Sequence, residues 1–167
     1  MQIAAVQTNI FWEDPVSNYE HLDNLLKEVS KVDLIVLPEM FTTGFTMNSM
    51  NVAEEGDGRT LKWMKELSVK KNAAVTGSVV IKEEGSFFNR LYWVEPSKEH
   101  QYYDKKHLFR MADENRYYSQ GKNRLITNFR EFRICPMICY DLRFPVWSRN
   151  INKDKNPVYD CLIYVAN

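Results

Sequence analysis

Three residues with complementary chemistry each follow an apolar, strand-like run of the sequence. Cys139 follows ICPMI, Glu39 follows DLIVLP, and Lys105 follows the aromatic run HQYYD. The end of a strand holds a side chain on a rigid backbone, next to a loop that can supply partners. The sequence therefore makes Cys139 a candidate nucleophile, with a carboxylate and an ammonium group as candidate partners.

The three side chains together could hydrolyse an amide. A thiol with an ordinary pKa of ~8.5 is mostly protonated at neutral pH, so a base must take its proton or a cation must favour the thiolate. Glu39 can act as that base. Lys105 and the backbone N–H of Tyr140, the residue after Cys139, can donate to the oxyanion of a tetrahedral intermediate. The protonated glutamate would then protonate a leaving amine and activate water against the thioester, and no histidine is needed.

Other interpretations of the same residues remain open at this point. Cys139 could be a small buried hydrophobic residue, as most buried cysteines are. Glu39 could belong to a structural salt bridge. A redox role would need a second cysteine within reach, but Cys135 lies four residues earlier on the same strand, ~13 Å away, which is too far for a disulfide.

The composition favours one globular domain over residues 1–167 that acts on a small molecule. The chain is 44% hydrophobic and carries 22 basic and 22 acidic side chains, so no net charge attracts nucleic acid or a membrane surface. No targeting pattern and no apolar run of ~20 residues is found, which predicts a cytoplasmic protein without a membrane span. Three cysteines without CxxC spacing and three histidines without HxxxH spacing predict reduced thiols, no metal and no cofactor.

The apolar spacing predicts two amphipathic helices and eight strands. The first helix begins at Asp14, a capping residue, with Pro15 in its first turn, and the second covers residues 59–71. The strands are expected at residues 2–8, 33–38, 73–81, 87–94, 100–104, 124–129, 132–138 and 158–166. Those at 2–8, 33–38 and 158–166 read as buried, and 73–81 pairs with 87–94 as a hairpin.

Two other details bear on the site. Lys105 and Lys106 are adjacent at a strand end, so only one of them should point inward, because neighbouring strand residues face opposite sides. Residues 40–58 read as a loop, and Phe45 within it could be a wall of a pocket or could simply pack the loop.

The segments LPEMFTTGF, YDKKHLF and ICYDLRFP resemble, in order, the three catalytic motifs of the carbon–nitrogen hydrolase (nitrilase) superfamily. The resemblance covers the whole chain. It implies that Glu39 is the general base, Lys105 the oxyanion-stabilising lysine and Cys139 the nucleophile. It also implies that Glu114 is a second glutamate that orients the lysine and water. The implied fold is α+β, a four-layer α-β-β-α sandwich.

Finer details of the sequence point to a substrate class. The segments MFTTGF, HLFRMADE and YYSQG are similar to those of bacterial omega-amidases, which cleave the terminal amide of 2-oxoglutaramate and 2-oxosuccinamate. The runner-up substrate is an N-carbamoyl amino acid. Arg143, four residues after Cys139, could bind a substrate carboxylate as a bidentate pair, or could form a structural ion pair with Asp141 or another acid.

The resemblance also implies that the family's chains continue beyond Asn167. Residues 1–167 would then be the N-terminal two-thirds of such a chain, with the sandwich incomplete at the C-terminus. A wall of the pocket and much of the surface of an expected homodimer would lie in the remainder. The alternative to an enzyme is therefore a non-catalytic module that keeps the motifs but not a complete pocket.

Overall fold

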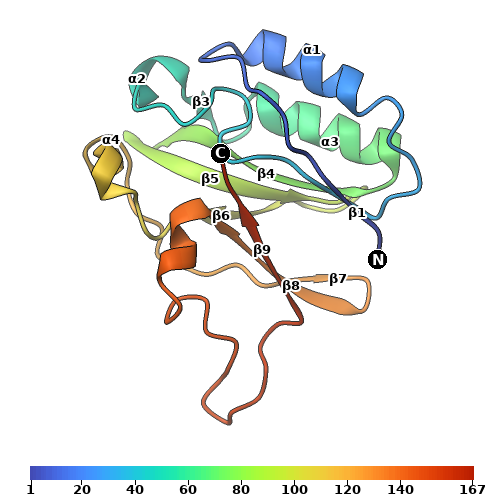
Figure 1. Cartoon of the computed structure of the whole chain (residues 1–167), viewed down its shortest axis with the longest axis vertical. Helices are drawn as coiled ribbons and strands as arrows, with labels where there is room; N and C mark the ends of the chain where they lie inside the picture. The colour runs from blue at the N-terminus through green and yellow to red at the C-terminus, as the bar shows by residue number, and fades with distance from the viewer.

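The structure of the chain is a computed structural model that describes residues 1–167. It contains a six-stranded sheet, a three-stranded sheet and two longer helices, α1 and α3, side by side over the larger sheet (Figure 1). The larger sheet has the order β1-β2-β4-β5-β6, with the short β3 paired to β4. Its strands are β1 Ile3–Ala5, β2 Leu34–Val36, β3 Glu54–Glu55, β4 Ala74–Glu83, β5 Ser86–Val94 and β6 Gln101–Asp104. The smaller sheet has the order β7-β8-β9, with β7 Thr127–Phe129, β8 Phe132–Ile138 and β9 Cys161–Val165.

The helices are short apart from two. They are α1 Pro15–Leu25, α2 Ser49–Val52, α3 Arg59–Lys71 and α4 Glu114–Tyr117, with two 3₁₀ turns, η1 Arg110–Ala112 and η2 Cys139–Arg143. The side chain of Asp14 caps α1 by accepting from the Ser17 N–H at 3.1 Å, and Pro15 occupies the first helical position. The predicted starts of α1 and α3 are therefore confirmed.

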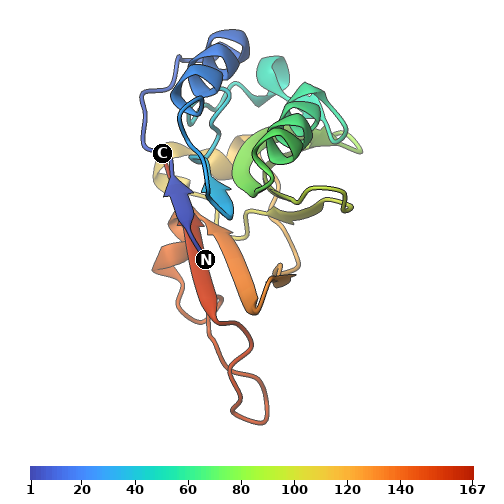
Figure 2. The ribbon, with the colours of Figure 1, turned by 90° about the vertical axis from the view of Figure 1, so that its right-hand side faces the viewer.

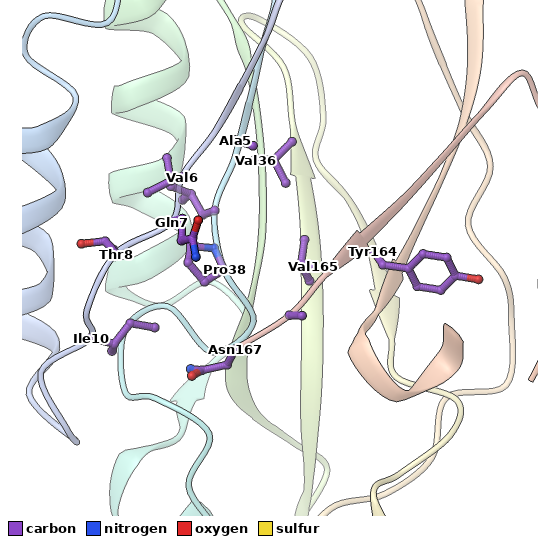
Figure 3. A pocket seen from close by; sticks show the side chains of 12 residues that line it. Ala5, Val6, Gln7, Thr8, Ile10, Val36, Pro38, Tyr164, Val165 and Asn167 are labelled. Atoms are coloured by element: carbon purple, nitrogen blue, oxygen red, sulfur yellow. The ribbon is translucent and has the colours of Figure 1, made fainter. Parts of the chain in front are cut away.

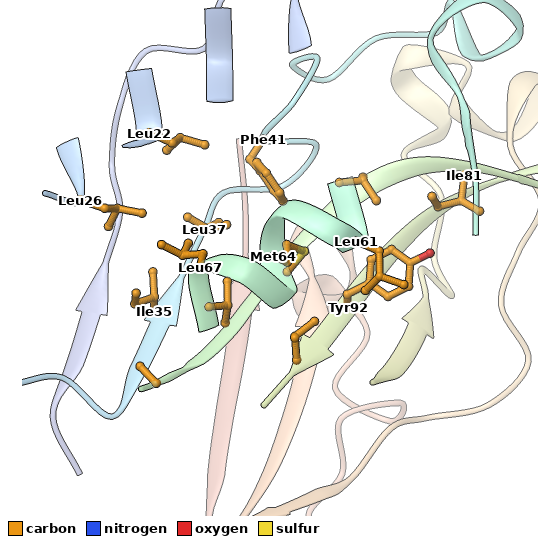
Figure 4. Packing of buried hydrophobic residues seen from close by; sticks show 14 residues of the cluster. Leu22, Leu26, Ile35, Leu37, Phe41, Leu61, Met64, Leu67, Ile81 and Tyr92 are labelled. Carbon is orange, nitrogen blue, oxygen red and sulfur yellow. The ribbon is translucent and has the colours of Figure 1, made fainter. Parts of the chain in front are cut away.

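Helices α1 and α3 cover one face of the larger sheet, and their apolar stripes form its main core (Figure 4). Leu22 and Leu26 at the C-terminal end of α1 and Met64 of α3 meet Ile35 of β2 and Val75 of β4 in a cluster of 14 buried residues. Burial of apolar side chains on this scale is the principal force that holds the helices on the sheet.

The smaller sheet packs on the opposite face of the larger one, as the two perpendicular views show (Figures 1 and 2). Leu91 of β5 and Tyr103 of β6 pack with Met137 and Ile138 of β8. The ring of Trp93 meets that of Phe129 at 5.6 Å between centroids, edge to face. The chain thus forms three layers, helix, sheet and sheet, which are three of the four expected from the sequence.

The predicted hairpin is confirmed, because β4 and β5 pair antiparallel. Two other strands, β1 and β9, were predicted to be buried but are largely not buried. β1 is three residues long and stands at the edge of the larger sheet, where it pairs only with β2 and leaves Ile3 45% exposed. β9 is an edge strand of the smaller sheet and only its last residue, Val165, is buried. A run of apolar residues shows that a strand forms, but not whether another strand lies on its outer side.

None of the helices has the length and apolar content needed to cross a bilayer.

Candidate active site

The ends of β2, β6 and β8 bring Glu39, Lys105 and Cys139 together between the two sheets. Glu39 and Lys105 are buried, and the Nζ of Lys105 donates to the Oε1 of Glu39 at 2.8 Å. The backbone N–H of Glu39 donates to the carbonyl of Ala166, just after β9, at 3.3 Å. Cys139 is half-buried and is the first residue of η2, directly after β8. Three segments far apart in the sequence therefore supply the thiol, the carboxylate and the ammonium group.

Glu114 completes this charged cluster. It is fully buried at the start of α4, and its Oε2 lies 3.0 Å from the Nζ of Lys105. The backbone N–H of Phe109 donates to the same Glu114 oxygen and fixes the orientation of the carboxylate. Lys105 is thus held between two carboxylates, in the arrangement that the sequence resemblance implied for Glu114.

The charges of the cluster depend on one another. Burial alone would lower the pKa of Lys105, but the attraction of Glu39 and Glu114 outweighs it, so its pKa is raised. Burial raises the pKa of Glu114 above its ordinary value, while Lys105 opposes that rise. The lysine therefore keeps its proton and can offer charged donors inside a site from which water is largely excluded.

Asn89 is a member of the cluster that the sequence interpretation missed. It lies buried in β5, and its Nδ2 donates to the Oε1 of Glu39 at 2.9 Å and to the Oε1 of Glu114 at 3.3 Å. Its Oδ1 has no hydrogen-bond partner. One signal could have found this residue: an amide inside an apolar strand run is costly to bury unless its hydrogen bonds are satisfied.

Cys139 has an unusual backbone and a weakly acidic thiol. Its φ is +40°, in the left-handed region that a residue with a Cβ rarely adopts. Burial, together with the nearby charge of Glu39, raises the pKa of the thiol to about 11, although Lys105 acts in the opposite direction. The sulfur is therefore protonated at neutral pH, and a base must remove that proton before the sulfur can attack.

Aromatic side chains line the cluster. The Nζ of Lys105 lies 5.1 Å from the centroid of the Phe45 ring, which places Phe45 beside the charged groups. Phe45 is 6.4 Å from Phe109, and Phe109 meets Tyr140 edge to face at 4.9 Å, measured between ring centroids. Phe45 and Tyr140 were predicted to lie at the site, whereas Phe109 was not singled out.

The two remaining sequence questions concern basic residues. Lys105 is buried whereas Lys106 is partly exposed, with its Nζ 5.5 Å from the centroid of the Trp147 ring, so the expectation of one inward lysine is confirmed. Arg143 is exposed and forms no ion pair. Its suggested partner Asp141 is instead buried, and its carboxylate accepts from Tyr103 and from His107. The alternative prediction, that Arg143 forms a structural ion pair with Asp141, is therefore wrong.

A separate cleft of about 450 Å³ lies between β1–β2 and β9 (Figure 3). Val6, Pro38 and Val165 are among its lining residues, and Asn167 beside them donates from Nδ2 to the carbonyl of Glu39 at 3.2 Å. Its lining residues include no lysine, histidine, cysteine or carboxylate. The side chains that line the cleft thus supply no thiol, amine, imidazole or carboxylate, and the candidate active site is the cluster around Lys105.

The fold is a layered sandwich of helices and two sheets, and its charged cluster joins a cysteine, a lysine and two glutamates. Residues 2–159 match the model of the carbon-nitrogen hydrolase family. The chain belongs to the carbon-nitrogen hydrolase family.

Similar proteins are longer than this chain. The omega-amidase YafV of Escherichia coli (strain K12) is 43% identical over 167 residues, which is 100% of this chain and 63% of that protein. The 2-oxoglutaramate amidase of Bacillus subtilis (strain 168) is 32% identical over 153 residues, 88% of this chain and 58% of that protein. The chain therefore spans somewhat less than two thirds of the length of these curated relatives.

Solved structures give the same picture of the fold. XC1258 from Xanthomonas campestris, a CN-hydrolase superfamily protein, superposes with a TM-score of 0.94 at 40% identity over 99% of this chain and 64% of that one. Saccharomyces cerevisiae Nit3, of the nitrilase superfamily, superposes with a TM-score of 0.80 at 20% identity over 98% of this chain and 63% of that one. The α+β fold expected from the sequence is confirmed by these likenesses.

Proposed function

We propose that the protein hydrolyses a linear carboxamide through a thioester on Cys139. The observation that carries this proposal is the position of Lys105, whose Nζ is held 2.8 Å from Glu39 and 3.0 Å from Glu114 in a buried cluster next to the thiol. A buried ammonium group between two carboxylates is a costly arrangement for stability alone. It suits a reaction that develops negative charge on an oxygen.

The first half of the reaction forms the thioester. Glu39 takes the proton of the Cys139 thiol as the sulfur attacks the carbonyl carbon of the amide, and the C=O bond becomes a C–O⁻ bond. Lys105 and the backbone N–H of Tyr140 donate to this oxyanion, and each such donor is typically worth roughly 2.7–4 kcal/mol. The protonated Glu39 then gives its proton to the nitrogen, the C–N bond breaks, and ammonia leaves.

The second half regenerates the thiol. Glu39 takes a proton from a water molecule, the resulting hydroxide attacks the thioester carbonyl, and the same donors stabilise the second oxyanion. The C–S bond then breaks, the sulfur recovers the proton from Glu39, and a carboxylic acid is released. Glu114 keeps Lys105 oriented through both halves by its ion pair at 3.0 Å.

We propose a 2-oxo-dicarboxylic acid monoamide as the substrate, as for an omega-amidase. The omega-amidase and 2-oxoglutaramate amidase relatives support this substrate class. Arg143 is exposed four residues after Cys139 and forms no ion pair, so its guanidinium is free to bind a substrate carboxylate. Phe45 and Tyr140 would contact the carbon chain. An N-carbamoyl amino acid is the alternative, since the same three catalytic groups could cleave it.

The experiment measures ammonia released by the purified protein from 2-oxoglutaramate and from an N-carbamoyl amino acid. Cys139→Ala should abolish release, and Cys161→Ala, which removes a half-buried cysteine of β9, should not. Activity that survives in Cys139→Ala would refute the mechanism. A folded wild-type protein that neither releases ammonia nor forms an acyl-enzyme on Cys139 would instead support a non-catalytic module.

We also propose that residues 1–167 form one domain and that the longer chain implied by the relatives forms a homodimer. Leu142 and Val146, just after the nucleophile, are 61% and 86% exposed, and apolar side chains exposed in this way are typical of association surfaces. Analytical ultracentrifugation of the longer chain would test this, and a monomer at micromolar concentration would contradict it.

A further inference from the structure

Asp141 is a fully buried carboxylate that the proposed reaction does not use. It lies in η2, two residues after Cys139, and its Oδ1 accepts from the backbone N–H of His107 at 2.9 Å and from the His107 ring at 2.8 Å. Its Oδ2 accepts from the hydroxyl of Tyr103 at 2.7 Å and from the backbone N–H of Ile138 at 3.2 Å. Four donors thus converge on one side chain.

The positions of these donors in the sequence connect the two catalytic segments. Tyr103, within β6, stands two residues before Lys105, and His107, after the end of β6, stands two residues after it. Ile138 is the residue before Cys139, at the end of β8. One carboxylate therefore holds both flanks of the lysine and also closes the turn that carries the nucleophile.

The proton positions around Asp141 follow from the neighbouring groups. The Tyr103 oxygen accepts from the backbone N–H of Lys106 and from the Nε1 of Trp147, both at 3.1 Å, so its single proton is left for Asp141. Burial, reinforced by the charge of Asp141, raises the pKa of the Tyr103 hydroxyl, which keeps that proton. A carboxylate only accepts, so we assign the His107 proton that faces it to Nδ1.

The orientation of the His107 ring is fixed by a second aromatic contact. It stacks on the Phe144 ring at 3.8 Å between centroids with an interplanar angle of 6°. Phe144 follows η2 directly, so this stack fastens the far end of the nucleophile turn to the lysine segment. Tyr103 and His107 are therefore each fixed by a second contact, and the Asp141 carboxylate lies between groups that cannot move freely.

We propose that Asp141 is a positioning residue that sets the separation of Cys139 from Lys105. The backbone of Cys139 has φ +40°, a conformation that persists only where surrounding contacts impose it. Asp141 supplies such a contact by accepting from Ile138 on the preceding side of the cysteine, while it accepts from both flanks of the lysine. This inference rests on the proposed function only in so far as it predicts an effect on turnover.

The substitution Asp141→Asn tests the inference with little change of shape. In either orientation the new NH₂ group replaces one acceptor oxygen and faces a backbone N–H, that of His107 or that of Ile138. Displacement of catalytic groups by about 1 Å can cost on the order of a hundredfold in rate. We therefore expect kcat to fall about ten- to hundredfold. KM for the amide should change little, because Asp141 is fully buried and both its oxygens already accept hydrogen bonds from the protein.

The control is Asp160→Asn, which alters an exposed aspartate paired with Arg133 at 2.7 Å beyond the other end of β8. It should leave kcat unchanged. Tyr103→Phe removes one of the four donors and should lower kcat less than Asp141→Asn does. The fraction of folded protein, measured by circular dichroism, corrects each kcat for a loss of fold.

Hydrogen exchange gives a second measurement that needs no activity. In Asp141→Asn, backbone amides of residues 103–109 and of residues 137–141 should both exchange faster, while those of the β4–β5 hairpin should not change. If the wild type hydrolyses no amide, the proposed function fails, yet this joint loss of protection would still support the coupling of the two segments. Unchanged kcat, or faster exchange in only one of the two segments, would overturn the inference.

Discussion

Glu39→Gln should change two properties of Cys139 in opposite directions. The wild-type cluster holds two carboxylates, Glu39 and Glu114, and one ammonium group, that of Lys105. The substitution removes the negative charge near the thiol and leaves Glu114 and Lys105 as a balanced pair. It also removes the proposed base. The thiolate should therefore become easier to form, while hydrolysis of the amide should slow.

The size of each effect can be worked from the structure. The pKa of Cys139 is raised to about 11, with burial the largest cause and the charge of Glu39 the next. Because burial remains after the substitution, we expect the pKa to fall by about one, which corresponds to ~1.4 kcal/mol and about tenfold more thiolate at pH 8. Loss of a general base typically lowers kcat by about 10²–10⁴-fold.

The assay compares two rates in the same preparation at pH 8. Alkylation of Cys139 by iodoacetamide, followed by peptide mass, reports the thiolate, and ammonia release reports hydrolysis. Glu66→Gln, an exposed carboxylate on α3, is the matched control and should change neither rate. If alkylation of Glu39→Gln slowed in parallel with hydrolysis, Glu39 would be favouring the thiolate rather than opposing it, and the electrostatic reasoning would be refuted.

Three further outcomes are expected. Lys105→Met should lower kcat by about 10²–10³-fold. It should also lower the free energy of unfolding, measured with urea, by about 3–5 kcal/mol, because two carboxylates lose their buried partner. Adding Glu114→Gln to this variant should restore part of the stability but not the activity. Asn89→Leu should also lower the free energy of unfolding, because each lost hydrogen bond to a charged group is worth about 1.5–3 kcal/mol, and a loss no larger than that of an exposed substitution would contradict this. The rate at which iodoacetamide alkylates wild-type Cys139 should rise about tenfold per pH unit and level off only near pH 11, because the raised pKa keeps the thiol protonated below that pH. A rate that levels off below pH 9 would exclude the raised pKa.

The sequence could predict the residues whose chemistry is visible from their local surroundings. Glu39, Lys105 and Cys139 stood out because each follows a strand-like run, and the structure brings them together, although their catalytic roles remain proposals. Glu114 was found through the family resemblance alone, since nothing local distinguishes it within a polar loop. Its burial at the start of α4 depends on packing against segments far away in the sequence.

The partners that hold the site were harder to predict for the same reason. Asn89 reaches both glutamates only because β5 lies in the same sheet as β2 and pairs with β6. Asp141 turns inward only because Tyr103 of β6 and His107, just after β6, donate to it. In the sequence, Asp141 was considered only as a partner for Arg143, its near neighbour. A donor and an acceptor separated by 25 to 50 residues leave no periodic signal in the sequence.

The left-handed backbone of Cys139 has a consequence for the balance between stability and reactivity. Glycine adopts a φ of +40° without the steric cost, of order 1–2 kcal/mol, that a Cβ imposes there. At an ordinary strand end alanine is the more stable replacement, because glycine is the more flexible in the unfolded chain by roughly 0.5–1 kcal/mol. At position 139 the order should be reversed or levelled, so that Cys139→Gly melts no lower than Cys139→Ala. The nucleophile would then occupy a position where glycine, which has no side chain, has the least backbone strain. The folded protein would be less stable by the cost of that strain for as long as it keeps a cysteine there.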